Sequence, residues 1–265
     1  MRLNLVDRLI SFVPGKTLHV AFDTGRRQDP AVILLHGIAA TSNTWKPLIH
    51  KLDHKNHRII ALDILGFGGS PIPPKAKYSA EQHCTYIHRT LLKLRVKKPY
   101  ILVGHSMGSI LATHYASIWP NDVSKLILAS LPLYDRGNKK ASSKIPTDIY
   151  FRVYQFFRKN RKFTINGSRA LRKILHIPDG IDVSERNWPA FKYSLSNTIE
   201  KQNTFKELKK IKMPTTIIIG RQDEFSVNST LKTASRFDNV HLKIIPLSDH
   251  SINARIANAI IHELN

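Results

Sequence analysis

The chain has 265 residues, of which 42% are hydrophobic and 23% charged, a composition typical of a soluble globular protein. No stretch reaches the roughly 18 consecutive apolar residues of a membrane span, and the first residues lack the pattern of a secretory signal peptide. A single cysteine, Cys84, excludes an internal disulfide, so we predict folding in a reducing compartment and a cytoplasmic location.

The formal net charge of +22 attracts anions such as nucleic acid, anionic lipid or acidic substrates. Basic residues are spread along the chain, with clusters at 158–162 and 209–212. No helix-turn-helix, zinc-finger or aromatic single-strand-binding pattern accompanies them, so we expect no specific nucleic-acid partner. Solvated faces explain most of this charge, and weak association with an anionic lipid surface remains open.

Strand-like apolar runs alternate with helical periodicity along most of the chain. In chain order, we expect an antiparallel edge strand at 17–22 and further strands at 31–35, 58–63, 100–103, 123–128, 215–219 and 241–245. Helices are predicted from Ser42 or Asn43, from the Ser79–Gln82 capping pair through 94, and over 107–118. Residues 5–13 fit either a strand or a short helix. The alternation predicts an α/β fold with a mostly parallel central sheet and helices on both faces.

The alternation stops at about residue 133 and resumes at about 203. Helical spacing recurs around 149–157, 170–175 and 188–199, with no strand-like run between them. We therefore predict a core made of 1–132 and 203–265, with a helical cap at 133–202 inserted between two late strands. Five aromatic side chains of this cap either line an apolar substrate pocket or form the cap's own small core: Tyr150, Tyr154, Phe157, Trp188 and Phe191.

A serine flanked by glycines lies between a predicted strand and a predicted helix, in Gly104-His105-Ser106-Met107-Gly108. This is the G-x-S-x-G pattern in the strand–turn–helix context of a nucleophile elbow. The serine occupies a tight, strained turn, so the flanking positions must be small enough for strand and helix to approach. The sequence therefore predicts that Ser106 is a nucleophile.

A second glycine turn, His36-Gly37-Ile38, follows the predicted strand 31–35. The oxyanion formed in acyl transfer needs preorganised N–H donors. We expect the backbone N–H groups of Ile38 and Met107 to supply them, because Gly37 lets the loop turn towards the serine.

A serine hydroxyl needs a base, and position must select one of the chain's 13 histidines. His250 follows the last predicted strand at the start of the last helix, whereas His36 and His105 lie in the two loops above and have supporting roles. Asp223, after the strand 215–219, is the favoured carboxylate to orient His250. Asp135 and Glu224 are the alternatives.

Together these motifs resemble the α/β-hydrolase superfamily, in particular its cap-bearing branch of esterases and related hydrolases. The residues that carry the resemblance are His36-Gly37, Asp63-x-x-Gly66-x-Gly68-x-Ser70, Gly104 to Gly108, Gly220-x-x-Asp223 and Asp249-His250-Ser251. In that family the segment from Asp63 to Ser70 is a structural turn. Ser106 departs from the aspartate of epoxide hydrolases and haloalkane dehalogenases, which implies an acyl-serine mechanism.

The resemblance and the predicted triad imply a serine esterase that cleaves a carboxylic ester with a small or medium apolar acyl part. No metal or organic cofactor is expected, because no metal-ligand cluster or phosphate-binding loop is visible. A serine-dependent acyltransferase or lyase could use the same residues, and a non-catalytic binding protein is a third possibility.

Overall fold

The computed structural model describes residues 15–25, 30–52, 56–134, 147–175, 182–226 and 228–264. The undecided segment 5–13 and the alternative carboxylate Asp135 lie outside these residues.

One sheet of seven strands organises the described residues, in the order β1-β3-β2-β4-β5-β6-β7. The edge strand β1 is antiparallel to β3, and every other neighbouring pair is parallel. This confirms the predicted mostly parallel sheet. The strand bounds are Val20–Asp23 (β1), Val32–Leu35 (β2), Ile59–Leu62 (β3), Tyr100–His105 (β4), Val123–Ala129 (β5), Thr215–Gly220 (β6) and Val240–Ile245 (β7).

Helices connect most of the parallel strands. The core helices are α2 (Lys46–Ile49, preceded by the 3₁₀ turn η1, Ser42–Trp45), α3 (Ala80–Lys93), α4 (Met107–Ile118, followed by the 3₁₀ turn η2, Pro120–Asp122), α8 (Thr204–Lys210), α9 (Asn228–Ala234) and α10 (Ala254–Leu264). Between β5 and β6 lie α5 (Thr147–Lys159), α6 (Arg161–Leu175), α7 (Trp188–Ser194) and the π-helical turn η3 (Leu195–Ile199). The described parts of this segment contain helices, as predicted, while its treatment as a separate cap at 133–202 stays a prediction.

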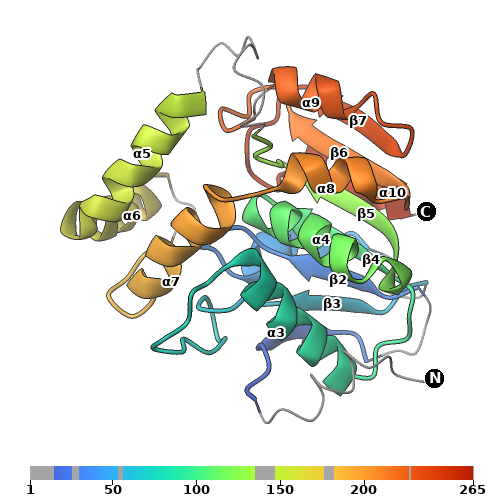
Figure 1. Ribbon diagram of the computed structural model, residues 1–265, viewed down its shortest axis with the longest axis horizontal. Coiled ribbons are helices and arrows are strands. Elements are labelled where there is room, and N and C mark those ends of the chain that lie inside the picture. The colour runs from blue at the N-terminus through green and yellow to red at the C-terminus, as the bar shows by residue number, and fades with distance from the viewer. Residues whose placement is uncertain are drawn as a thin grey trace.

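Alternating side chains of the strands build an apolar core on each face of the sheet. In β2, Ile33 and Leu35 join a large cluster that includes side chains of α3, α4 and α8, whereas Val32 and Leu34 join one with α2 and α10. Figure 1 shows α3, α4 and α8 in front of the sheet, and α5 and α6 standing to one side of it. The sheet is therefore covered on both faces, which explains its continuously apolar strands.

Local hydrogen bonds explain where two predictions and the structure differ in detail. The edge strand begins at Val20, not at Thr17, because the N–H groups of Leu18 and His19 donate to side chains, Thr90 Oγ1 and Ser70 Oγ, instead of to a strand. The helix α3 begins as predicted, with Ser79 Oγ accepting from Gln82 N. The Gln82 side chain, however, accepts from Tyr78 N, one residue before the cap. Among the described residues, no helix is long and apolar enough to cross a bilayer.

Candidate active site

The carboxyl ends of four parallel strands bring the predicted site residues to one edge of the sheet. β2 leads into Gly37, β4 into Ser106, β6 into Asp223 and β7 into His250. Ligands of open α/β sheets bind outside this edge. The parallel topology alone thus gathers residues that are more than 200 positions apart in the chain.

Ser106 lies in the sharp turn between β4 and α4 and has a left-handed backbone, with φ 53° and ψ −118°. A serine with positive φ is strained, and such strain is concentrated at functional sites. The turn is tight because a Cβ on Gly104 would overlap the main chain at Gly108, and one on Gly108 would overlap the main-chain oxygen of Leu35. The two glycines therefore let β4, α4 and β2 approach one another.

The turn after β2 lies directly beside Ser106. A Cβ on Gly37 would come within 3.1 Å of Ser106 Cβ and 3.3 Å of His105 Nδ1. His36, which is fully buried, fixes this turn by donating from Nδ1 to Gly37 O (2.7 Å) and accepting at Nε2 from Ile64 N (3.0 Å). Burial lowers the pKa of His36 to about 4, so the ring is neutral, as these two bonds require.

Asp223 and His250 form a hydrogen-bonded pair. His250 Nδ1 donates to Asp223 Oδ1 across 2.9 Å, and Phe225 N donates to the same oxygen across 3.0 Å. Burial raises the pKa of Asp223, but the hydrogen bond and charge of His250 and the Phe225 N–H outweigh it, so that the net pKa is lowered. The carboxylate is therefore ionised at neutral pH. Because Nδ1 of His250 carries the proton that it donates to Asp223, Nε2 is the nitrogen that can accept a proton.

His105, for which the sequence predicts a supporting role, contacts the main chain of His250, a partner that the sequence did not indicate. Its Nε2 donates to the main-chain oxygen of His250 across 2.7 Å, and the two rings lie 5.2 Å apart between centroids. Burial, and then the neighbouring charge of His250, lowers the pKa of His105 to about 3, so the ring remains neutral. A side chain adjacent to Ser106 thus holds the backbone of the predicted base. No local sequence pattern signals this contact, because its partners are 145 residues apart.

The Ser106 hydroxyl and His250 Nε2 have no hydrogen-bond partner among the described residues. Ser106 is 9% exposed, and the His250 side chain is 27% exposed with the Phe225 ring 4.8 Å away. Nucleophile–base hydrogen bonds are often long without substrate and tighten in the complex. Neither atom is therefore tied to another described residue.

The two predicted oxyanion donors flank Ser106. Met107 is the first residue of α4, so its N–H belongs to the unpaired first turn of that helix. Ile38 follows Gly37, whose close approach to Ser106 is described above, and its N–H has no partner in the described part of the chain. Negative charge at a helix N-terminus is also favoured by the helix dipole.

The alternative carboxylate Glu224 is exposed. Its main-chain oxygen accepts a hydrogen bond from Tyr150 Oη. The geometry thus brings Asp223, not the Glu224 side chain, to His250. The other alternative, Asp135, lies outside the described residues.

The five aromatic residues predicted to line a pocket or a cap core belong to the main apolar cluster. Tyr154, Trp188 and Phe191 are buried, and Tyr150 and Phe157 pack against the cluster. Tyr154 Oη is hydrogen-bonded to Tyr134 Oη across 2.7 Å. These contacts favour the structural alternative, and a pocket-lining role stays a prediction.

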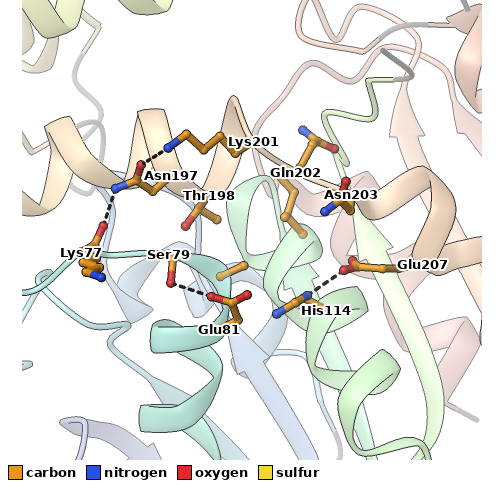
Figure 2. Close-up of a pocket in the computed structure, with 12 residues that line it drawn as sticks. Lys77, Ser79, Glu81, His114, Asn197, Thr198, Lys201, Gln202, Asn203 and Glu207 are labelled. Carbon is orange, nitrogen blue, oxygen red and sulfur yellow. Dashed lines mark hydrogen bonds and ion pairs between the residues drawn. The ribbon is translucent and has the colours of Figure 1, made fainter. Parts of the chain in front are cut away.

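A cavity of about 320 Å³ lies along the side of α4, away from Ser106, His250 and Asp223. Its wall includes His114 of α4 and Glu207 of α8, joined by a 2.7 Å hydrogen bond, and Asn197, which bonds to Lys201 and to Lys77 O (Figure 2). Ten of the twelve residues that line it are polar or charged, and none is one of the five predicted aromatics.

The predicted structural turn at Asp63 is closed by internal hydrogen bonds. The carboxylate accepts from Ser42 N (2.8 Å), Gly69 N (2.9 Å) and His19 Nδ1 (2.9 Å). A Cβ on Gly68, with φ +54°, would overlap this carboxylate. Asp63 is therefore fully occupied in holding the loop after β3.

Comparison with known proteins agrees with this fold. The family model described as alpha/beta hydrolase fold matches residues 30–254, and the chain belongs to this family. An esterase from Exiguobacterium antarcticum superposes with a TM-score of 0.74 at 19% identity, covering 95% of this chain and 98% of its own. At that identity the likeness shows the fold alone.

Several curated relatives with similar sequences carry lipase or lysophospholipase names. A human protein named "Monoacylglycerol lipase ABHD6" is 25% identical over 254 residues, 84% of this chain and 70% of its own. A protein of Arabidopsis thaliana named "Probable lysophospholipase BODYGUARD 1" is 31% identical over 121 residues, 44% of this chain. This chain spans about a quarter of the length of that group of plant relatives. The fold is thus that of the alpha/beta hydrolases, and the two relatives named above are a lipase and a probable lysophospholipase.

Proposed function

We propose that this protein is a serine esterase that cleaves a carboxylic ester through an acyl-enzyme on Ser106. The observation that carries the proposal is the hydrogen-bonded Asp223–His250 pair at the same sheet edge as a strained serine with φ 53°. Those are the parts that acyl transfer requires: a nucleophile, a base whose tautomer is fixed, and a carboxylate that stabilises the imidazolium.

In the proposed reaction, His250 Nε2 removes the Ser106 proton as Oγ attacks the ester carbonyl carbon. The N–H groups of Ile38 and Met107 bind the resulting oxyanion. His250 then gives its proton to the leaving alcohol, and the acyl group stays on Ser106. His250 next removes a proton from water as the water oxygen attacks the acyl carbon. The bond from the acyl carbon to Ser106 Oγ then breaks, His250 gives its proton to Oγ, and the carboxylic acid leaves.

We propose an ester with an apolar acyl part as the substrate, with a monoacyl lipid as the first candidate. The names of the relatives, monoacylglycerol lipase and lysophospholipase, support this class. The excess of basic residues supports an anionic lipid surface as the place of action. A cytoplasmic location also remains part of this proposal.

Hydrolysis of p-nitrophenyl esters from acetate to palmitate tests the proposal, with wild type compared with Ser106→Ala and Ser109→Ala. Ser109 is the matched control, a buried serine one turn along α4 whose Oγ bonds to Gly104 O and Ala129 O. We expect activity in wild type and Ser109→Ala, and none above background in Ser106→Ala. Equal activity in wild type and a folded Ser106→Ala would refute the proposal, and accumulation of a transesterified product with added alcohol would favour the acyltransferase.

A further inference from the structure

The helix pair α5–α6 presents apolar side chains to solvent at one edge of the molecule. Phe156 is 47% exposed, Phe163 58% and Val153 40%. The Phe156 and Phe163 rings touch edge to face, with centroids 5.3 Å apart, so the two helices contribute to one continuous patch. Figure 1 shows this pair standing to the side of the sheet. Exposed aromatic clusters of this kind mark interaction surfaces.

Basic residues predominate in the segment that carries this patch. Residues 150–168 contain five basic residues and no acidic one. Two of the five have acidic partners from other segments, because Arg158 pairs with Glu200 at 3.5 Å and Arg161 pairs with Glu185. The exposed side chains of Arg152, Lys159 and Lys162 have no ion pair with any described residue.

An apolar face flanked by uncompensated cations is the signature of a helix that lies in the interface of an anionic membrane. The apolar rings enter the boundary between head groups and acyl chains, while the basic side chains contact the lipid phosphates. A partner protein with an acidic surface would satisfy the cations but not the adjoining exposed phenylalanines.

We propose that α5–α6 is a lipid-docking surface, with Phe156, Phe163 and Val153 as its apolar contact and Arg152, Lys159 and Lys162 as its cations. This inference deepens the proposed function, because it gives a location to the anionic surface on which the ester is cleaved. The helix pair α5–α6, and not the net positive charge of the whole chain, is then what binds the lipid surface.

Vesicle binding in a Ser106→Ala background tests the surface independently of catalysis. Sedimentation compares vesicles of phosphatidylcholine alone with vesicles of phosphatidylcholine and phosphatidylglycerol in a two-to-one ratio, at low and high salt. We expect binding to the anionic vesicles that weakens with salt. If the protein binds anionic vesicles but wild type hydrolyses no ester, the docking surface is supported and the proposed function is refuted. If wild type hydrolyses esters but the protein does not bind the vesicles, the proposed function is supported and the docking surface is refuted.

Two variants with matched controls locate the contact. Arg152→Gln/Lys159→Gln/Lys162→Gln and Phe156→Ser/Phe163→Ser should each weaken binding by about tenfold or more. Lys209→Gln/Lys210→Gln/Lys212→Gln removes the same charge from the other basic cluster, and Ile118→Ser/Ile244→Ser removes two exposed apolar side chains elsewhere. Both controls should bind as the parent does.

Three results would overturn the proposal: no binding to anionic vesicles at low salt, equal loss in the two lysine-containing triple variants, or unchanged binding in Phe156→Ser/Phe163→Ser. If that phenylalanine variant instead turns a dimer into a monomer in sedimentation velocity and leaves vesicle binding intact, the patch is an interface between copies of this chain. Thermal unfolding of each variant verifies that it is folded.

Discussion

Two alanine substitutions at glycines of the site should separate activity from stability. In Gly37→Ala, the new methyl group lies 3.1 Å from Ser106 Cβ and 3.3 Å from His105 Nδ1, so these neighbours must move by a few tenths of an ångström. In Gly108→Ala, it overlaps the buried main-chain oxygens of Leu35 and His36, which cannot move without distorting β2.

The magnitudes follow from those contacts. A misplacement of 1 Å at a reacting group costs about 10²-fold in rate, so Gly37→Ala should lose about tenfold in kcat/KM, or about 1.4 kcal/mol of transition-state stabilisation. Its unfolding free energy should fall by only about 1 kcal/mol. Gly108→Ala should lose about 3 kcal/mol of unfolding free energy, at the upper end of overpacking costs.

Urea unfolding and ester hydrolysis on the same preparations measure both quantities. Gly167→Ala is the control, because a Cβ there has nothing within 4 Å and lies inside α6. That change should stabilise the protein by about 0.5–1 kcal/mol and leave kcat/KM unchanged. The reasoning is refuted if Gly37→Ala retains full kcat/KM, or if it destabilises the protein more than Gly108→Ala does.

Three further substitutions test individual interactions. Asp223→Asn should fold normally but lose about 10³–10⁴-fold in kcat, because His250 then loses its fixed tautomer and its counter-charge; near-wild-type kcat would contradict this role. Burial raises the pKa of the Glu263 carboxyl, but hydrogen bonds from the Lys243 and Thr216 side chains outweigh this and lower it from 4.5 to about 2. The ionised carboxylate therefore stabilises the folded protein above pH 4.5, and this stabilisation is lost as the pH falls towards 2. Glu263→Gln should therefore lower the Tm at pH 7, with a difference that shrinks on acidification, and a pH-independent difference would argue against this account. Tyr150→Phe removes the hydrogen bond to Glu224 O and should lower kcat/KM several-fold through the adjacent Asp223 loop, whereas unchanged kinetics would show that the loop needs no support from α5.

Strand positions were predictable because this sheet is buried on both faces. The run 31–35 becomes β2 (Val32–Leu35), and 215–219 becomes β6 (Thr215–Gly220), within one residue. Continuous apolar runs bounded by polar or glycine residues show where such a strand begins and ends. The turn at Ser106 was equally predictable, because the G-x-S-x-G pattern lies within one short segment, although Gly108 is required by a contact with the distant main chain of Leu35.

Features that depend on contacts between distant residues could not be predicted from the sequence. The helices α8 and α9 have seven residues each, too few for their periodicity to indicate them alone. The helix predicted over 188–199 is α-helical only to Ser194 and then widens into the π-helical turn η3. The bond from His105 to His250 O and the exposure of Phe156 and Phe163 both depend on how elements pack, which no local pattern contains.

Active-site labelling tests the central claim most directly. Wild type and the Ser106→Ala and His250→Ala variants are treated with a fluorophosphonate, and intact mass and peptide mapping locate the adduct. The account predicts one adduct, on Ser106, in wild type, none at any site in Ser106→Ala, and much slower labelling in His250→Ala. An adduct on a different serine, or no labelling of the folded wild-type protein, would contradict the assignment of Ser106 as the nucleophile.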